Sequence, residues 1–234
     1  MKVELISKTI GLNSYSGLND EEHVSAIARH STIKPDGGKL IKYLIKNKHW
    51  SPLQFLSFGF KIETSRAISA QIFRHRSLNA QEWSQRYSKT TEFETAEFRV
   101  EHASNRQSSS EWIGAIIENE GVFVPEIHSC KTKHQMKAIS QASEALQNMA
   151  EAYNELIESG VAKECARMIL PMGTKTTIHI SGTLRDLFSF MNVRLDQHAQ
   201  KEIRDIAKAI GEELQEHLPN VFESLPDWEK GLFL

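Results

Sequence analysis

Three arginines, a histidine, a glutamate, a tyrosine and two serines lie within fourteen consecutive positions of this chain, residues 74–87, which read RHRSLNAQEWSQRY. The planar donor forks of Arg74, Arg76 and Arg86 match phosphate and carboxylate groups. Ser84 and nearby backbone N–H groups would complete a phosphate cradle. A solvated surface with a helix-capping role has the same composition, so composition alone leaves both interpretations open.

The element that must position this segment lies just upstream of it. Residues 65–73 read SRAISAQIF, and their apolar members Ala67, Ile68, Ile72 and Phe73 fit one face of a helix. The arginines at 74 and 76 would then follow the helix end, where the carbonyl-rich terminus favours cations. The polar segment after them has no regular period, which predicts an ordered loop.

Three other stretches carry residues that could act with this loop, but each of these residues could also have a purely structural role. His49 precedes Ser51-Pro52 and could simply lie beside a helix cap. Arg167 lies in the sequence ECARMILP and could bind an anion or extend its charge out of an apolar surface. Arg194 and His198 are four residues apart, so on a helix they would share a face, as many surface pairs do.

Length and composition predict one domain over residues 1–234, large enough to bury a core. The formal net charge is -2, which gives no general attraction to nucleic acid. The first residues, MKVELISKTIGLN, lack the uninterrupted apolar run of a signal peptide, and no apolar run reaches membrane length. Two cysteines, Cys130 and Cys165, make no disulfide framework. We therefore expect a cytoplasmic protein, with Cys165 packed on an apolar helix.

Apolar periodicity predicts an α+β fold, a single helix-rich domain with a small central sheet. Pro52 would start a helical turn with Ser51 as its cap, and residues 101–112 would be a polar surface excursion. The predicted strands are residues 3–6, 56–62 and 174–181. Besides the helix at residues 65–73, we predict a helix that begins at Asp20 and helices at residues 39–46, 131–158 (ended by Gly160), 162–169, 184–191 and 203–214.

The order of the residues narrows the interpretation. Arg74-His75-Arg76, then seven residues, Ser84 and finally Arg86-Tyr87 resembles the signature of the flavin-dependent thymidylate synthases. The resemblance extends over most of the chain through four further elements, namely Ala28-Arg29-His30-Ser31, His49-Trp50-Ser51-Pro52, ECARMILP, and LRDLFSFMNVRLDQHAQ at residues 184–200.

This resemblance implies a reductive methylation of dUMP to dTMP. The carbon would come from methylenetetrahydrofolate and the hydride from reduced FAD, which NADPH regenerates. It also implies a homotetramer with shared active sites, in which FAD lies between subunits, and it requires no cysteine nucleophile, no nucleic acid and no membrane. A flavoprotein of the Rossmann type is not indicated, because the sequence lacks Gly-x-Gly-x-x-Gly.

The resemblance also assigns roles to residues by matching positions. Arg194 and His49 would be catalytic, Arg194 by binding the uracil ring in its N3-ionised form, which a fixed guanidinium stabilises. The residues that would bind FAD are Ser51, Arg74, His75, Arg76, Glu82, Thr183, Leu184, Arg185, Ser189 and His198. The residues that would bind dUMP are Gln71, Arg74, Glu82, Trp83, Ser84, Gln85, Arg86, Arg167 and Arg194, with Ser84 and Arg86 near its phosphate.

Five positions depart from the family pattern. Asn79 and Gln81 replace a serine and an asparagine often found between the arginines and Ser84. Thr183 and Ser189 stand where asparagines are common, and Phe55 where a histidine is often seen. The individual FAD contacts at these positions are therefore open.

Three further hypotheses come from other classes of protein. His128, Cys130 and His134 lie within seven residues and are possible zinc ligands, but no fourth ligand is evident, so we predict no metal site. A nucleic-acid-binding module could use the arginines with Trp83 and Tyr87 as stacking platforms, against which the negative net charge argues. A nucleotide-binding relative that has lost catalysis is the remaining alternative.

Overall fold

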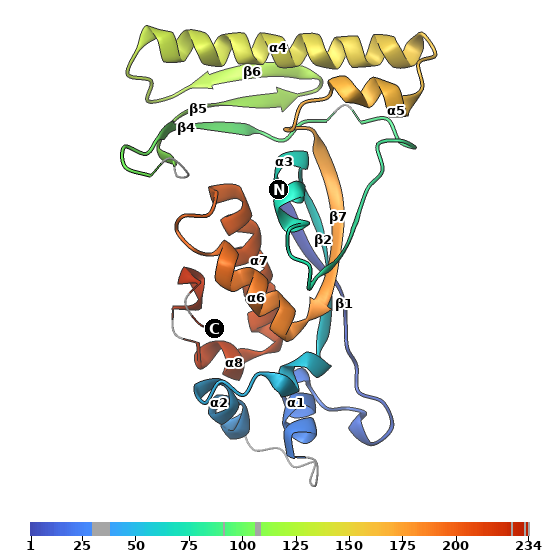
Figure 1. Ribbon diagram of the computed structural model, residues 1–234, viewed down its shortest axis with the longest axis vertical. Helices are drawn as coiled ribbons and strands as arrows, with labels where there is room; N and C mark the ends of the chain where they lie inside the picture. Colours follow the sequence, from blue (N-terminus) through green and yellow to red (C-terminus); the bar gives the residue numbers. More distant parts are fainter. Residues whose placement is uncertain (30–37, 91, 106–108, 226, 232, 234) are drawn as a thin grey trace. The chain divides into compact units, whose positions relative to one another are not determined.

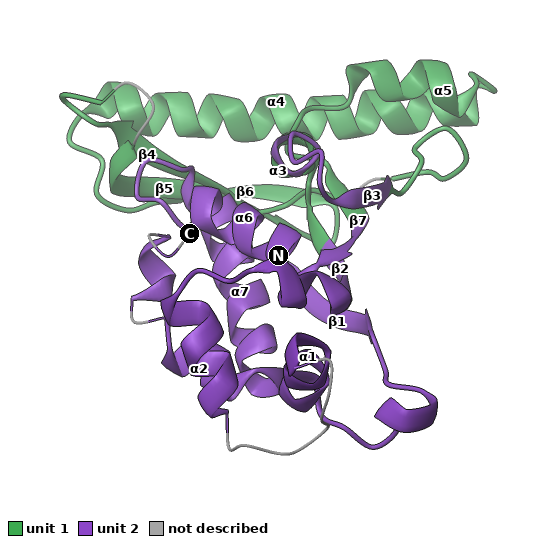
Figure 2. Cartoon of the chain, turned by 60° about the horizontal axis from the view of Figure 1, so that its bottom comes forward, with its two compact units in different colours: residues 1, 63–70, 82–177 green, residues 2–62, 71–81, 178–234 purple. Residues whose placement is uncertain are grey.

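The computed structural model describes residues 1–29, 38–90, 92–105, 109–225, 227–231 and 233 (Figure 1). The chain divides into two compact units, which Figure 2 colours separately. Unit 1 contains residues 1, 63–70 and 82–177, and unit 2 contains residues 2–62, 71–81 and 178–234. The prediction of one domain over the whole chain stays a prediction.

The strands form two sheets. One sheet has the order β1-β2-β7-β3, and the other, which is antiparallel, has the order β4-β5-β6. The bounds are β1 (Lys2–Lys8), β2 (Ser57–Ser65), β3 (Asn79–Glu82), β4 (Ala96–Glu101), β5 (Ser109–Asn119), β6 (Val122–Ile127) and β7 (Lys175–Thr183).

The helices follow in chain order between and after these strands. The α-helices are α1 (Asp20–Arg29), α2 (Lys39–Lys46), α3 (Arg66–Ile72), α4 (Lys133–Glu158), α5 (Lys163–Ala166), α6 (Leu184–Arg194), α7 (Lys201–His217) and α8 (Pro219–Glu223). Short 3-10 helices are η1 (Asn13–Tyr15), η2 (Ser51–Phe55), η3 (Arg167–Ile169) and η4 (Trp228–Lys230).

The core of unit 2 combines strand and helix periodicities. Phe58, Phe60 and Ile62 alternate along β2 and are almost completely buried. On α7, one stripe at helical spacing is completely buried: Ile203, Ile206, Ala207, Ile210 and Leu214. These patterns explain why β2 and α7 form where they do, since each element buries one regular face.

Unit 1 is built from the antiparallel sheet and α4, which lies along it in Figure 1. Its core gathers Phe93, Ile116, Phe123 and Ile139 with their neighbours, and Phe93 packs edge-to-face on Phe123. A side chain at Gly114 would place Cβ 2.3 Å from the carbonyl oxygen of Glu126, so only glycine fits there. The hydroxyl of Ser143 on α4 donates to the main-chain oxygen of Phe123 at 2.8 Å, which ties the helix to β6.

Both ends of α4 carry recognisable capping structures. At its start, Thr132 Oγ1 accepts from the N–H of Gln135 at 3.1 Å, and Gln135 Oε1 accepts from the N–H of Thr132 at 3.1 Å, which is a capping box. At its end, Gly160 has φ of +88°, and the N–H groups of Gly160 and Val161 donate to the carbonyls of Ile157 and Leu156. The predicted end of this helix at Gly160 is therefore confirmed, with the geometry of a Schellman motif.

Most of the elements expected from the sequence are confirmed. The predicted α+β class holds, and the strands near residues 3–6, 56–62 and 174–181 are β1, β2 and β7. The six helical segments predicted apart from the one upstream of the arginines correspond to α1, α2, α4, α5 with η3, α6 and α7. The helix predicted for residues 65–73 is α3, and the expected turn after Trp50 is η2.

The polar excursion expected at residues 101–112 lies on the surface over its described residues, and it contains the end of β4 and the start of β5. Three expectations about local structure were wrong. Part of the predicted loop after Arg76 is a strand, β3. Ser51 does not cap η2, whose N-cap residue is Trp50 without a side-chain bond. Cys165 is exposed rather than packed, because α5 turns it outward from the buried Ala166.

No helix in the described part of the chain is long and apolar enough to cross a membrane. His30 and Ser31, the last two residues of the predicted Ala28-Arg29-His30-Ser31 element, lie outside the described residues.

Replacing Thr132 with Ala should lower the free energy of unfolding by about 1 kcal/mol, because the N-terminal turn of α4 loses its side-chain acceptor. Chemical denaturation of both proteins would measure the difference. Ser140→Ala is the matched control, because the Ser140 hydroxyl bonds back to the carbonyl of Met136 within the same helix. That change should be neutral or slightly stabilising. Equal losses in both variants would contradict the assigned role of Thr132.

Candidate active site

Arg194, the last residue of α6, is held by two neutral acceptors within unit 2. Its Nε donates to Nε2 of His75 at 2.7 Å, and its Nη2 donates to the main-chain oxygen of Gln71 at 2.9 Å. The side chain of Gln71 is fixed in turn, since its Nε2 donates to Oε1 of Gln200 at 2.7 Å. No carboxylate of the described chain pairs with Arg194, so the guanidinium is fixed without being neutralised.

His75 is a neutral acceptor in this arrangement. Burial, and next the positive charge of Arg194, lower the pKa of His75 from 6.5 to about 4. Because arginine only donates, Nε2 of His75 must accept, so its neutral ring carries the proton on Nδ1. The ring also packs edge-to-face on Phe190 of α6, with 4.8 Å between centroids. His75 therefore orients Arg194 at neutral pH.

Positive charge is concentrated near Arg194. Burial, and next the charge of Arg74, lower the pKa of Arg194 below its usual value, although an arginine remains charged at neutral pH. Arg74 and Arg76 are exposed and have no carboxylate partner within the described residues. Like charges destabilise one another unless an anion lies nearby, so this cluster suits an anionic ligand.

Glu82 is the fixed carboxylate among the predicted site residues, and it belongs to unit 1. Its Oε2 pairs with Nη1 of Arg66, and its Oε1 accepts from the hydroxyl of Ser69 at 2.6 Å. The Glu82 side chain is only 14% exposed. Arg66 and Ser69 are not among the predicted site residues, although their spacing of three on α3 places them on one helix face, where both could meet one group.

A cavity of about 290 Å³ in unit 1 is lined by two arginines and one glutamine as its polar side chains, so donors outnumber acceptors there. Arg66, Gln85 and Arg167 line it, together with the apolar residues Met168, Leu170, Pro171 and Met172. Gln85 is 6% exposed, and its Nε2 is buried without a hydrogen-bond partner among the described residues. Arg167 has no ion-pair partner there either. A buried donor without an acceptor is costly, so this cavity is suited to an anion or a carbonyl group.

The predicted cradle of Ser84 and Arg86 is occupied by protein contacts. The hydroxyl of Ser84 accepts from the N–H of Arg86 at 3.3 Å. The guanidinium of Arg86 pairs with Glu164 through Nε at 3.2 Å and Nη2 at 3.0 Å. Both side chains of that pair are about half exposed, so solvent screens it and an anion could displace Glu164 at small cost.

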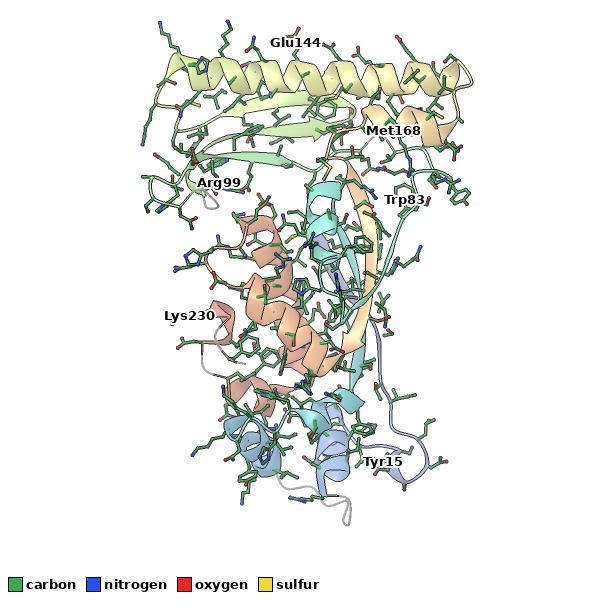
Figure 3. All side chains as sticks on the ribbon, viewed as in Figure 1. Tyr15, Trp83, Arg99, Glu144, Met168 and Lys230 are labelled. Atoms are coloured by element: carbon green, nitrogen blue, oxygen red, sulfur yellow. The ribbon has the colours of Figure 1, made fainter. Side chains whose placement is uncertain are left out.

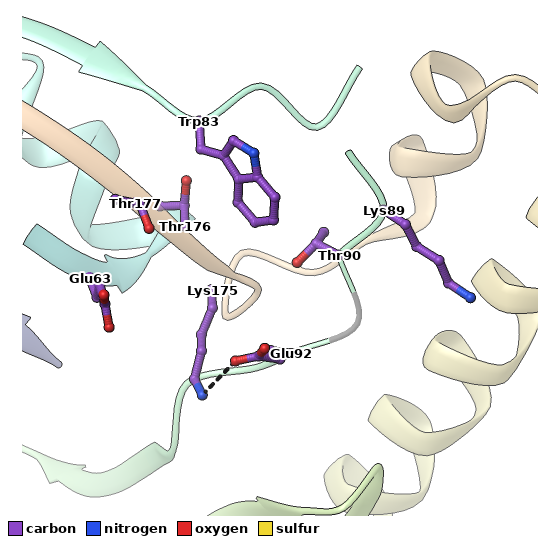
Figure 4. A pocket seen from close by; sticks show the side chains of 8 residues that line it. All are labelled: Glu63, Trp83, Lys89, Thr90, Glu92, Lys175, Thr176 and Thr177. Carbon is purple, nitrogen blue, oxygen red and sulfur yellow. Dashed lines mark hydrogen bonds and ion pairs between the residues drawn. The ribbon is translucent and has the colours of Figure 1, made fainter. Parts of the chain in front are cut away.

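The side chain of Trp83 lines a different cavity of unit 1, of about 300 Å³ (Figure 4). Its main-chain N–H donates to the carbonyl of Thr177, and its indole N–H donates to Ser88 at 3.2 Å. Lys175 and Glu92 form an ion pair at 3.2 Å in the wall of this cavity. Trp83 is 43% exposed, and Met168, which lines the first cavity, is 79% exposed. Figure 3 labels both side chains.

Several residues predicted to bind FAD serve the helix that carries them. Thr183 Oγ1 caps α6 by accepting from the N–H of Asp186 at 3.3 Å, and it donates to the Asp186 carboxylate at 2.6 Å. The side chain of Leu184 is completely buried. Ser189 donates to the carbonyl of Arg185 at 3.0 Å. The guanidinium of Arg185 has no partner among the described residues and the residue is exposed, so its charge remains available to a ligand.

The remaining predicted residues are exposed and stand apart from these contacts. The N–H of His49 donates to the carbonyl of Leu44 at 2.8 Å, its ring lies edge-to-face near Tyr43, and Ser51 is exposed. The expectation that Arg194 and His198 share a helix face was wrong, because α6 ends at Arg194. His198 lies in the following turn, where its Nδ1 contacts the Asp196 carboxylate at 2.7 Å.

The structure gives no support for the zinc hypothesis. No group of three or more His, Cys, Asp or Glu side chains in the described chain is placed to hold a metal. The ring of His128 stacks on Trp112 with 4.3 Å between centroids, and the thiol of Cys130 donates to the carbonyl of Ile113.

His75 should titrate near pH 4 in an NMR titration of its ring protons. Because the unfolded chain binds this proton with a pKa near 6.5, it holds more protons than the folded state between about pH 4 and 6.5, and this group's contribution to stability falls as the pH falls through that window. In Arg194→Gln the pKa of His75 should rise while staying below 6.5, because burial, the larger cause, remains.

Val193→Ala is the matched control for that titration, since Val193 is a neighbouring exposed residue on α6. It should leave the pKa of His75 near 4. A wild-type His75 that titrates near 6.5, or one that Arg194→Gln does not move, would refute the proposed pairing.

The amino-acid sequence of this chain matches one protein family and several of its members. The family model described as "Thymidylate synthase complementing protein" matches residues 6–220, which include residues of both units. The chain is 36% identical over 195 residues to the "Flavin-dependent thymidylate synthase" of Synechocystis sp., covering 83% of this chain and 82% of that protein. It is 34% identical over 235 residues to the "Probable flavin-dependent thymidylate synthase" of Paramecium bursaria Chlorella virus 1, covering 97% of this chain and 100% of that protein.

A third relative shows that the matching region can be part of a longer protein. The "Flavin-dependent thymidylate synthase" of Thermus thermophilus is 34% identical over 190 residues, which cover 80% of this chain and 63% of that protein. The family match over nearly the whole chain, together with identities above 30% over most of its length, shows that this chain belongs to the family of flavin-dependent thymidylate synthases.

Proposed function

We propose that this chain catalyses the reductive methylation of dUMP to dTMP. In this proposal methylenetetrahydrofolate supplies the carbon, reduced FAD supplies the hydride, and NADPH regenerates the reduced flavin. Membership of the family supports a thymidylate synthase that depends on flavin. The proposed substrates and the roles of individual residues come from the resemblance to this family, and the chemistry of the side chains supports them.

The observation that carries the proposal is the arrangement around Arg194. Its guanidinium is fixed by His75 and by the carbonyl of Gln71, both neutral, and it retains its charge. A fixed cation of this kind stabilises negative charge that develops on a uracil ring when N3 is deprotonated, and it does so without reorganisation. His75 can hold Arg194 in this position only while it is neutral, which its pKa of about 4 ensures at neutral pH.

The donors present also fit the predicted cofactor. FAD carries a pyrophosphate, and arginine is the side chain best matched to phosphate oxygens. Arg74, Arg76 and Arg185 are exposed, and within the described residues no carboxylate neutralises them. When bound, FAD would supply the redox chemistry, and these three arginines would hold its phosphates. Thr183, Leu184 and Ser189 could contribute only main-chain contacts without disturbing α6, because their side chains cap the helix, lie in the core or bond within it.

The cavity of Gln85 and Arg167 would hold part of dUMP. A nucleotide phosphate would provide the acceptor that Gln85 Nε2 lacks and the anion that Arg167 lacks. Glu82, held by Arg66 and Ser69, would accept from N–H or O–H groups of the ligand. We also propose a homotetramer with shared active sites and a role for His49 near the flavin, both on the basis of family membership.

The purified protein should show a visible flavin absorption, which NADPH bleaches and dUMP perturbs, and it should form dTMP from dUMP and methylenetetrahydrofolate. In Arg194→Ala the flavin spectrum should persist while kcat/KM for dUMP falls on the order of 100- to 1000-fold, as expected for loss of a fixed electrostatic stabiliser.

Val193→Ala serves as the control for that variant and should keep wild-type activity. Full activity of Arg194→Ala would refute the role given to Arg194. A protein that remains colourless after incubation with FAD, and that forms no dTMP, would refute the proposed function itself, and salt-dependent oligonucleotide binding would then be tested.

Replacing Gln85 with Leu should affect binding and stability in opposite directions. Loss of the amide donor should weaken dUMP binding about tenfold, the loss typical of a hydrogen bond to a charged group. The free energy of unfolding should be unchanged or higher, because the buried donor without a partner is removed. Calorimetric titration and chemical denaturation measure the two quantities.

Met172→Leu is the matched control for Gln85→Leu, since it changes the apolar wall of the same cavity and removes no donor. It should leave dUMP affinity nearly unchanged. A Gln85→Leu protein that binds dUMP as tightly as the wild type would place the phosphate elsewhere.

A further inference from the structure

The pairing of Arg66 with Glu82 differs in its surroundings from the other arginine–glutamate pair of the RHRSLNAQEWSQRY segment. Arg86 and Glu164 are 54% and 52% exposed, and solvent screens their attraction. Arg66 and Glu82 are 35% and 14% exposed, so their charges interact more strongly and are costlier to desolvate. A half-buried ion pair contributes little net stability compared with apolar packing, so its presence here calls for another explanation.

The backbone around Arg66 is anchored independently of its side chain. The N–H groups of Arg66 and Ala67, which begin α3, donate to the carbonyls of Thr174 and Met172 at 3.0 and 2.9 Å. The first turn of α3 is thereby tied to the segment before β7. Ser69, one turn later on α3, presents its hydroxyl to the same carboxylate. The two donors come from one short, anchored helix.

Each oxygen of the Glu82 carboxylate has its own donor on this helix. Oε2 faces Nη1 of Arg66, and Oε1 accepts from Ser69 Oγ at 2.6 Å. With both oxygens held, the plane of the carboxylate is fixed and it cannot rotate about its terminal torsion, which is otherwise broad. A fixed plane sets the directions along which both oxygens accept hydrogen bonds.

We propose that Arg66 and Ser69 are positioning residues that orient the Glu82 carboxylate for its ligand contact. This inference rests on the proposed function, because Glu82 is there assigned to dUMP. Arg66 also lines the cavity of Gln85 and Arg167. Arg66 therefore contacts Glu82 through its guanidinium and also lines the space assigned to the nucleotide, so we expect a ligand there and the orientation of Glu82 to be coupled through this residue.

Substitution of Arg66 tests this role. In Arg66→Gln, kcat/KM for dUMP should fall on the order of 10- to 100-fold, the range expected when a supporting contact is lost and a reacting geometry is misaligned. The loss should appear in KM for dUMP more than in visible flavin absorption. Arg66→Lys should recover part of it, because a single nitrogen contacts Glu82 and an ammonium can replace it. Ser69→Ala should cost a few-fold.

A double-mutant cycle separates positioning from a general structural effect. If Arg66 acts through Glu82, then Arg66→Gln added to Glu82→Gln should change kcat/KM by less than about twofold beyond Glu82→Gln alone. The double variant also removes both charges together, so it leaves no buried charge unpaired and is expected to fold. Chemical denaturation of each variant confirms that folded proteins are compared.

Arg99→Gln is the matched control, since Arg99 pairs with Glu97 at 2.7 Å in the β4–β5 hairpin of the same unit. Its activity should equal that of the wild type. An Arg66→Gln protein with wild-type kcat/KM, or one whose loss is equally large in the Glu82→Gln background, would overturn the inference while the proposed function stands. A wild-type protein that forms no dTMP would instead remove the proposed function, and the inference with it.

Discussion

An arginine held by neutral acceptors keeps its full charge for a ligand, and the candidate site depends on this condition at Arg194. His75 meets it because burial and the nearby guanidinium lower its pKa to about 4. A protonated His75 would lose its acceptor atom and repel Arg194, so the ring must remain desolvated. Its packing on Phe190 and the completely buried apolar face of α6 maintain that environment. The core of unit 2 thus determines the protonation state of a site residue.

Unit 1 differs from unit 2 in what it offers a ligand. It contains hydrogen-bond donors that lack an acceptor among the described residues, whereas unit 2 holds Arg194 without neutralising its charge. The amide of Gln85 is buried without an acceptor, and Arg167 lines the same cavity without an ion pair in the described chain. Such groups lower the stability of the protein without ligand, and a ligand that satisfies them returns the lost free energy as affinity. Glu82 lies outside this pattern, because Arg66 and Ser69 already hold its two oxygens. Unit 1 therefore combines two donors without an acceptor in the described chain, Gln85 and Arg167, with the Glu82 carboxylate, whose two oxygens already have donors.

The sequence predicted the elements whose apolar period is regular and missed those whose period is broken. The alternation of β2 and the helical stripe of α7 each bury one complete face, so their positions could be predicted. In β5 the first residues are polar and exposed, and β6 contains Pro125, which an edge strand tolerates but which weakens a strand prediction. The sheet of unit 1 was missed because its burial depends on packing against α4, a tertiary contact that the pattern within each strand does not reveal.

For the site, residue types could be predicted from the motif, but the partner of each side chain could not. Prediction of a continuous loop after Arg76 would place Glu82 and Trp83 together around one ligand. The chain instead forms β3 there, and Trp83 continues its pairing by donating to the carbonyl of Thr177. Successive side chains of a strand point to opposite faces, so Glu82 meets Arg66 and Ser69 while Trp83 enters a different cavity. Glu82 and Trp83, which are consecutive in the motif, therefore contribute to two different places in unit 1. Only the strand geometry distinguishes the residues that act on a ligand from those that hold the backbone around it.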